Sequence, residues 1–312
     1  MPTGVNMNQQ KILFPLDYTG FSEDILQWAV RYLDNSTCSI SCLIVVDTLE
    51  KLDKLHRASK ILEEAKKLFE TWGFNKVKCD FIIHRDIPNA VCDYANTNSI
   101  DQIIMATHGQ SFARMPLDSV SQKIMKNAKQ PVLILKNPAL STTEEAHLSR
   151  DQVISILIPV SDEKTAGRLI ALMEGLVNKE AAVIHVLHAV VYDTDNIGYL
   201  NMKLKEASRI IENNKRALEN AGYWVADAEI AVGEVADVIS KYANAKKSDY
   251  IALLSWGRSH LKRLCFGSVS AGLLKQNKHK IFLFSEGKAL QIKRKAVERI
   301  PMLMQLRPSI RQ

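Results

Sequence analysis

The sequence of 312 residues lacks any long uninterrupted apolar segment. No stretch of about 18 residues is both apolar and uncharged, which argues against a membrane-spanning helix. Residues 1–10 are polar and show neither the basic region nor the apolar core of a signal peptide. With 46% hydrophobic and 24% charged residues, the composition is typical of a folded globular protein, and the length predicts two domains. We therefore expect a cytoplasmic protein.

Cysteine is scarce and is not arranged in motifs. The chain has five cysteines without any C-x-x-C pair, and their odd number argues against a disulfide framework. They lie in apolar segments, so we interpret them as core thiols in a reducing compartment. They are Cys38, Cys42, Cys79, Cys92 and Cys265.

Motifs of common catalytic and metal sites are also absent. The sequence contains no Ser-His-Asp order, no activated Cys-His arrangement and no G-x4-G-K-[S/T] phosphate loop. His185 and His188 are three residues apart on an expected strand, where their side chains point to opposite faces, so we predict no metal site. Asp86 and Glu234 match helix N-terminal caps. We therefore expect no efficient ATPase and no catalytic residues, and a slow nucleotide hydrolase remains an alternative.

The net charge of +7 is concentrated at the C-terminus. Residues 287–312 carry seven basic residues and one acidic residue, which leaves +1 for the other 286 residues. Leu290 and Met304 fall near one helical face, whereas Pro301 and Pro308 limit any helix. We interpret this tail as packing on protein, either on its own domains or on a second subunit. A basic arm for a partner protein, nucleic acid or an anionic membrane is the alternative.

What the sequence does contain is an internal repeat. Tyr94-Ala95-Asn96, followed by Asp101, reappears 148 residues later as Tyr242-Ala243-Asn244, followed by Asp249. Further matches occur in the same order along both copies, so we infer a duplication. We divide the chain into a first domain (1–137), a linker (138–150), a second domain (151–286) and the basic tail (287–312).

Each copy alternates short apolar runs with longer amphipathic ones. The short runs predict strands, and the amphipathic segments between them predict helices. Strands that are buried on both faces and joined by helices indicate an α/β fold with a doubly wound parallel sheet in each domain. Ligands of such sheets bind beyond the carboxyl ends of the strands, where the strand order reverses. The predicted strands are 11–16, 39–46, 76–83, 102–106 and 132–135, then 153–159, 182–188, 223–231, 250–254 and 281–284.

The fourth predicted strand of each copy runs into a loop that contains glycine, at Gly109 and Gly257, and then into a helix. Backbone N–H groups of such a loop and of a helix N-terminus can bind phosphate. With these loops and Asp17 after the first strand, the chain resembles the tandem form of the universal stress protein family over residues 9–285. That family has the nucleotide signature G-x2-G-x9-G-[S/T] and an Asp that faces the adenosine.

The two copies depart from this signature in different ways. The first copy keeps Asp17, but Ala106 replaces the first glycine and Asp118 the last. The second copy keeps Gly257, Gly267 and Ser268, but Leu254 replaces the first glycine and Ser161 replaces the Asp. One copy thus retains the adenosine side and the other the phosphate side. Weak nucleotide binding in one half and a scaffold with two decayed sites are the alternatives.

The resemblance implies the adenine-nucleotide α-hydrolase-like fold and a stress-response module that binds or regulates. It also implies ATP or another adenine nucleotide as ligand, with no metal beyond a nucleotide-bound Mg²⁺. The last strands of two domains pair in this family, so residues 132–135 and 281–284 would join the halves into a pseudo-dimer, and two chains could form a homodimer. The nucleotide-binding residues implied by the resemblance are Asp17, Val45, Thr107, His108, Gly109, Ser119, Val120, Val186, Gly257, Arg258, Gly267, Ser268 and Val269.

Overall fold

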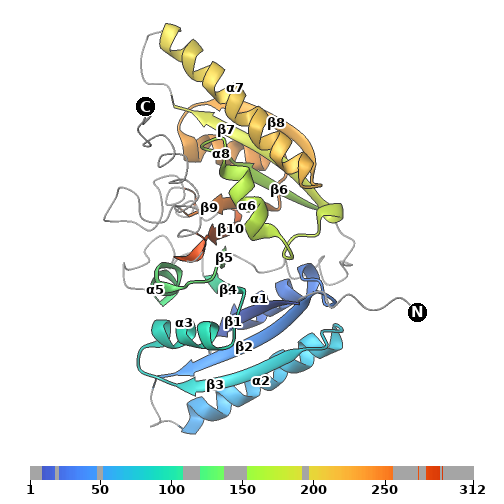
Figure 1. Ribbon diagram of the computed structural model, residues 1–312, viewed down its shortest axis with the longest axis vertical. Helices are drawn as coiled ribbons and strands as arrows, with labels where there is room; N and C mark the ends of the chain where they lie inside the picture. Colours follow the sequence, from blue (N-terminus) through green and yellow to red (C-terminus); the bar gives the residue numbers. More distant parts are fainter. Residues whose placement is uncertain are drawn as a thin grey trace, which may run out of the picture.

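The protein forms one extended α/β structure around a single long sheet (Figure 1). The computed structural model describes residues 9–17, 21–47, 52–107, 120–136, 153–191, 197–255, 273, 279–288 and 290. In these residues ten strands lie in the order β3-β2-β1-β4-β5-β10-β9-β6-β7-β8. The predicted fold class is therefore confirmed. The basic tail lies outside the described residues beyond its first few positions.

We refer to β1–β5 with their helices as the N-terminal half. Its strands are parallel to one another, and each predicted strand is present with its ends within two residues of the expected positions. The elements are β1 (Gln10–Leu16), α1 (Phe21–Tyr32), β2 (Cys38–Val46), α2 (Leu52–Thr71), β3 (Val77–Ile83), α3 (Ile87–Thr97), β4 (Gln102–Thr107), α5 (Val120–Asn127) and β5 (Val132–Lys136).

The C-terminal half repeats this arrangement with β6–β10, which are again parallel to one another. Its predicted strands are present within the same margin. The elements are β6 (Ile154–Pro159), α6 (Thr165–Met173), η2 (Lys179–Ala181), β7 (Ala182–Val190), α7 (Ile197–Asn220), β8 (Trp224–Val232), α8 (Val235–Ala245), β9 (Tyr250–Leu254) and β10 (Lys280–Ser285).

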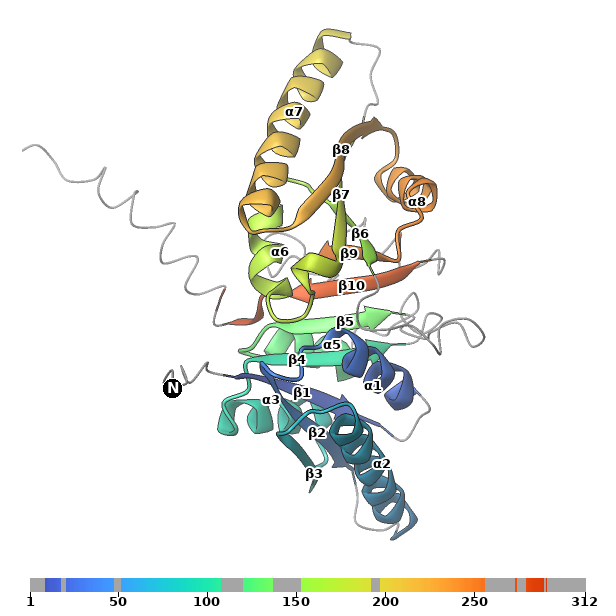
Figure 2. The same cartoon turned by 90° about the vertical axis from the view of Figure 1, so that its right-hand side faces the viewer.

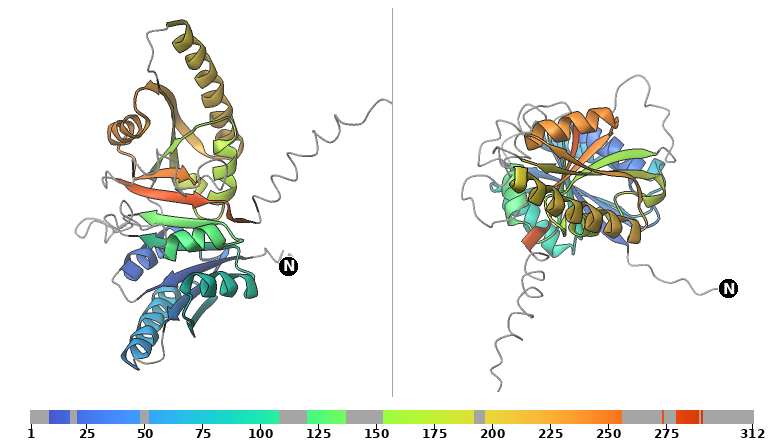
Figure 3. Two further views of the ribbon diagram at one scale, coloured as in Figure 1. Left: turned by 90° about the vertical axis from the view of Figure 1, so that its left-hand side faces the viewer. Right: turned by 90° about the horizontal axis from the view of Figure 1, so that it is seen from above.

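The two halves meet along the antiparallel pair β5 and β10, as the resemblance implied (Figure 2). Ile134 lies opposite Leu283, and the register continues from Val132 opposite Ser285 to Lys136 opposite Ile281. Because this pairing is antiparallel, the carboxyl edge of one half lies beside the amino edge of the other. The view from above in Figure 3 shows the strands fanned around the long axis, as expected for a twisted sheet.

Helices cover both faces of the sheet, which explains why the strands are apolar on both sides. One core layer lies under α1, α2, α6 and α7, and the other lies under α3, α5 and α8. Successive strand residues alternate between the layers: Ile12 and Phe14 belong to the first layer, and Leu13 belongs to the second. No helix of the described residues is long and apolar enough to cross a membrane.

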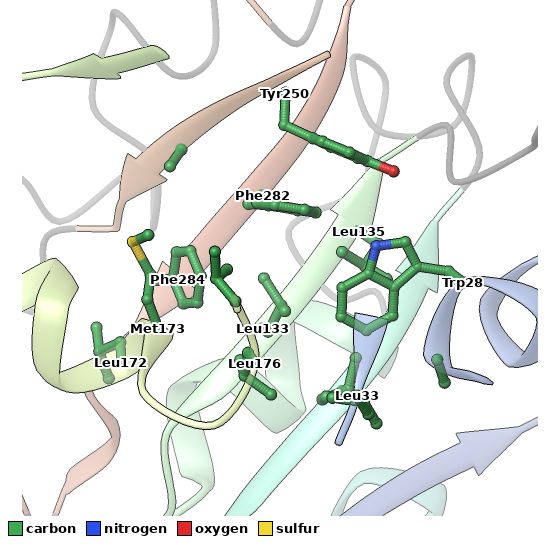
Figure 4. Close-up of a cluster of buried hydrophobic side chains, with 14 of the residues drawn as sticks. Trp28, Leu33, Leu133, Leu135, Leu172, Met173, Leu176, Tyr250, Phe282 and Phe284 are labelled. Carbon is green, nitrogen blue, oxygen red and sulfur yellow. The ribbon is translucent and has the colours of Figure 1, made fainter. Parts of the chain in front are cut away.

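An aromatic cluster fills the first core layer where the halves meet (Figure 4). The rings of Tyr250 and Phe282 are stacked with their centroids 4.0 Å apart. The indole of Trp28, from α1, meets Phe282 edge-on at 5.9 Å. Leu133 and Leu135 of β5 lie beside these rings in the close-up. Burial of such large side chains contributes strongly to stability, so this cluster joins the halves.

The repeated sequence motif serves the fold. The Asp101 carboxylate accepts a hydrogen bond from the backbone N–H of Lys11 at 2.8 Å, while the Asp101 N–H donates to the Lys11 carbonyl at 2.9 Å. Asp249 makes the same two bonds to Ser155, each at 2.8 Å. In each half, these two hydrogen bonds join the start of the fourth strand to the start of the first strand.

Candidate functional site

The strand order reverses once in each half, and these two places are the expected ligand positions. In the N-terminal half the reversal lies between β1 and β4, and in the C-terminal half between β6 and β9. Neither strand of such a pair follows the other in sequence, so their connecting segments leave in opposite directions. The space beyond the carboxyl ends is therefore open to a ligand.

Three predicted residues come together at this edge of the N-terminal half. Asp17 follows β1, Thr107 ends β4, and Val45 is the penultimate residue of β2. Because Leu16 is paired with Ile44, the next residues along the two strands place Asp17 level with Val45. Extending the β1–β4 register in the same way places Thr107 in this row.

The other residues predicted for the first copy follow Thr107 in the sequence, up to the start of α5. Val120 begins α5, and its side chain is exposed. His108, Gly109 and Ser119 lie outside the described residues.

The C-terminal half carries different chemistry in the equivalent row. The β6–β7 and β6–β9 registers extend to Ser161, Ala189 and Ser255. The carboxylate of the neighbouring Asp162 accepts hydrogen bonds from the Lys164 N–H at 2.9 Å and from the Thr165 hydroxyl at 3.0 Å. Asp162 therefore stabilises the turn before α6, and it does not replace the Asp that the second copy lacks.

A buried asparagine reinforces this turn. Asn214 of α7 is 0% exposed, and its side-chain oxygen accepts a hydrogen bond from the Ala166 N–H at 2.7 Å. Its amide group donates to the carbonyls of Asp162 and Ile210 at 2.8 and 2.7 Å. Asn214 thus provides the N-terminal cap of α6 from another helix. The sequence did not reveal this contact, because Asn214 is 48 residues from Ala166.

Val186, which was predicted alongside Val45, lies outside the equivalent row of the C-terminal half. Val186 lies in the middle of β7, paired with Ile158 and Ala228, and its side chain is 0% exposed in the core layer under α6 and α7. Val45 belongs to the other core layer. The remaining predicted residues of the second copy, Gly257, Arg258, Gly267, Ser268 and Val269, lie outside the described residues.

A buried lysine beside the N-terminal row was not predicted from the sequence. Lys136 is 1% exposed and is paired with Thr107 across β4 and β5. Burial lowers the pKa of its ammonium group to about 8. Lys136 thus stands beside Thr107, the residue that precedes the expected phosphate loop. A lysine that directly ends an apolar strand was the available signal.

The two histidines that are close in sequence have separate partners. The His185 ring bonds the Asp227 carboxylate at 2.9 Å, and the His188 ring bonds the Val160 carbonyl at 2.7 Å.

A surface depression of about 420 Å³ lies at the amino edge of β9 and β10, lined in part by Asp249 and His279. It is therefore on the edge opposite to the expected ligand position of the C-terminal half.

Comparison with known proteins agrees with this architecture. The model of the universal stress protein family matches residues 9–136 and again residues 155–282. A universal stress protein of Methanocaldococcus jannaschii is 27% identical over 144 residues, which cover 41% of this chain and 83% of the relative.

A solved structure shows the same fold. A universal stress protein of Archaeoglobus fulgidus covers 90% of this chain and 100% of its own, with a TM-score of 0.60 and 18% identity. Another structure from Archaeoglobus fulgidus, a universal stress protein in complex with dAMP, covers 41% of this chain and 98% of its own at 16% identity and a TM-score of 0.34. From the two family matches, the chain belongs to the universal stress protein family and contains its domain twice.

Proposed function

We propose that the N-terminal half binds an adenine nucleotide at the carboxyl edge of β1 and β4, and that the protein acts in the cytoplasm as a regulatory module of a stress response. The observation that carries this proposal is the row of Asp17, Val45 and Thr107 at the strand-order reversal. Across this edge the order is Val45, Asp17 and Thr107, which are an apolar residue, a carboxylate residue and a hydroxyl residue. These residue types suit a base, a ribose and a phosphate respectively.

Each residue has a definite part in this proposal. Asp17 accepts hydrogen bonds from the adenosine, and Val45 contacts the base. Thr107 leads into the loop that would hold the phosphates, and the charge of Lys136 attracts them from the neighbouring strand. Ala106 and Asp118 depart from the family signature on the phosphate side, so we expect weak binding. Hydrolysis, if any, is slow.

The C-terminal half is the poorer candidate for the adenosine side. Its row contains Ser161 and Ala189, and Asp162 is used in the turn before α6. We propose that this half serves chiefly as the partner of the N-terminal half across β5 and β10. Association of two chains into a homodimer stays a prediction, which light scattering of the purified protein would test.

Ligand analysis tests the nucleotide proposal. Mass spectrometry identifies any nucleotide released from the purified protein, and calorimetric titration with ATP, ADP and AMP measures its affinity. The Asp17→Ala variant should bind about tenfold more weakly, since the loss of one charge-assisted hydrogen bond costs about 1.4 kcal/mol. Ser161→Ala, at the equivalent position of the other half, is the matched control and should bind like the unmodified protein. Absence of binding at millimolar nucleotide would leave the scaffold as the function.

A further inference from the structure

Two cysteines that are distant in the sequence are neighbours in the sheet. Cys42 of β2 is paired directly with Cys79 of β3, so their side chains leave the sheet on the same face. Each thiol is the largest influence on the pKa of the other. They belong to the core layer under α1 and α2, next to Phe14 of β1 in the same row.

The two thiols differ in their access to solvent. Cys42 is 0% exposed, whereas Cys79 is only partly buried. Cys79 lies on β3, which is the outermost strand of the sheet. A small oxidant can therefore reach Cys79 from the edge, and Cys42 is placed behind it to react second.

The surroundings of Cys79 favour its thiolate form. The pKa of the Cys79 thiol is lowered, chiefly because the Cys42 thiol donates a hydrogen bond to it. Burial opposes this effect, and the positive charge of Lys66 on α2 supports it, while Asp80 and Glu70 act in the opposite direction. The pKa of the Cys42 thiol is raised well above its usual value by the same hydrogen bond and by burial. The thiolate is the reactive form of cysteine.

The other cysteines of the described residues lack this arrangement. Burial raises the pKa of the Cys38 thiol to about 11, and its sulfur lies 3.9 Å from the Gly175 carbonyl oxygen. Burial also raises the pKa of the Cys92 thiol. In the C-terminal half, the positions equivalent to Cys42 and Cys79 hold Val186 and Ala228, which are also paired. The thiol pair is therefore specific to one half.

We propose that Cys42 and Cys79 form an oxidisable thiol pair, which hydrogen peroxide converts into a reversible disulfide between β2 and β3. In the first step the Cys79 thiolate attacks one peroxide oxygen, the O–O bond breaks, and the hydroxide that leaves takes up a proton to form water. Cys79 is then a sulfenic acid. In the second step the Cys42 sulfur attacks the Cys79 sulfur, the S–O bond breaks, and hydroxide leaves as water with the Cys42 proton.

The net change is two thiols and one peroxide to one disulfide and two water molecules. The geometry suits a bond that is readily reduced again. Neighbouring strands are about 4.8 Å apart, which lies within the Cα separation of disulfides, whereas their Cβ atoms prefer a separation of about 3.8 Å. The Cβ atoms of Cys42 and Cys79 must therefore approach, and β3 can yield because it has a neighbour on only one side. An external dithiol would restore both thiols by exchange.

Peptide mapping of the full-length protein tests this proposal. The protein is treated with hydrogen peroxide, its remaining thiols are alkylated, and it is digested with trypsin without reductant. Peptides 32–51 and 79–85 should be recovered as one linked species, two hydrogen atoms lighter than their sum, which dithiothreitol separates. Peptide 32–51 also contains Cys38, so the digestion is repeated with Cys38→Ala, in which the link should persist.

Matched variants identify the two partners. Cys42→Val and Cys79→Ala install the residues found at these positions in the other half, so both variants should fold, and each should abolish the link. Cys92→Ala should leave it unchanged. The proposal is overturned if peroxide produces no link, if the link involves another cysteine, or if Cys79 is oxidised to sulfinic acid while Cys42 remains a thiol. These outcomes do not depend on nucleotide binding.

Discussion

The two halves have the same strand order but use their carboxylates differently. In the N-terminal half Asp17 stands in the row at the strand-order reversal, whereas in the C-terminal half Asp162, one position further along, bonds the turn before α6. Asp162, one residue beyond Ser161, thus belongs to this turn, whereas Asp17 is the proposed nucleotide ligand. Both halves keep the same architecture, because neither carboxylate belongs to the strands or to their apolar layers.

A second difference lies beneath α3 and α8. Tyr94 and Tyr242, which the repeat relates, donate hydrogen bonds to the carboxylates of Asp80 and Asp227. In the N-terminal half the cation beside the carboxylate is Lys78, which comes from β3. In the C-terminal half the cation is Lys246, which directly follows α8. His185, at the position equivalent to Ser41, also contacts the Asp227 carboxylate. The tyrosine–carboxylate bond is thus shared, and the other partners differ.

The largest expected effect concerns the seam between the halves. Ile134 is 0% exposed and lies opposite Leu283, so Ile134→Asp buries a charge without a partner and should lower the free energy of unfolding by more than about 4 kcal/mol. Leu283→Asp, its counterpart across the seam, should have a similar effect. Ile134→Val is the control, with an expected cost of about 1 kcal/mol. Thermal unfolding that is unchanged by both aspartates would contradict a seam through β5 and β10.

A smaller effect is expected where the chain leaves β10. The Arg168 guanidinium bonds both oxygens of the Glu286 carboxylate, at 2.8 and 3.1 Å, and the two side chains are only 11% and 9% exposed. Glu286→Gln should cost about 3 kcal/mol because it leaves the arginine charge buried without its counter-ion. Denaturant unfolding measures this cost.

The matched control for this pair is an exposed one in the same half. Arg209 and Glu163 are 2.7 Å apart, with side chains 69% and 40% exposed. Glu163→Gln should cost less than about 1 kcal/mol, since solvent screens exposed ion pairs. Equal costs for the two glutamates would mean that the Arg168–Glu286 pair does not hold α6 to the end of β10.

The smallest predicted effect concerns the two carboxylates beneath α3 and α8, which belong to Asp80 and Asp227. Burial alone would raise the pKa of Asp227, but hydrogen bonds from Tyr242, Lys246 and His185 outweigh it and hold this pKa below its usual value. The pKa of Asp80 is also lowered, against burial, by Lys78 and Tyr94. Replacement by Asn should cost about 2 kcal/mol at Asp227 and about 1 kcal/mol at Asp80, since Asp80 has fewer donors.

The same carboxylates predict a pH dependence. A carboxyl group whose pKa is lower in the folded state stabilises the protein above its unfolded pKa of about 3.9, and this contribution is lost as the pH falls through the folded pKa. The free energy of unfolding should therefore decline below about pH 4. In acid titrations, the free energy of unfolding of Asp227→Asn and of Asp80→Asn should decline less steeply than that of the unmodified protein. Identical acid profiles for all three proteins would contradict the roles of both carboxylates.

The strands and the two helix caps, which were expected from local patterns, were confirmed. Every predicted strand is present, and Asp86 and Glu234 cap α3 and α8 as expected. Local patterns suffice for these features because an apolar run needs burial whichever strand lies beside it, and a cap bonds backbone groups only three residues away. The rule for strand ends likewise pointed to Asp17 and Thr107, whereas Val45 was predicted only from the family resemblance.

Contacts between distant segments could not be anticipated in this way. The proximity of Cys42 to Cys79, the burial of Lys136 beside Thr107 and the cap that Asn214 gives to α6 all depend on which strands are neighbours and in which register. A shift of one residue would point each strand side chain to the opposite face. The duplicated architecture and its apolar layers follow from sequence patterns alone. The partners of the thiols, of the buried lysine and of the carboxylates depend on the tertiary structure, because these partners lie on separate strands and helices.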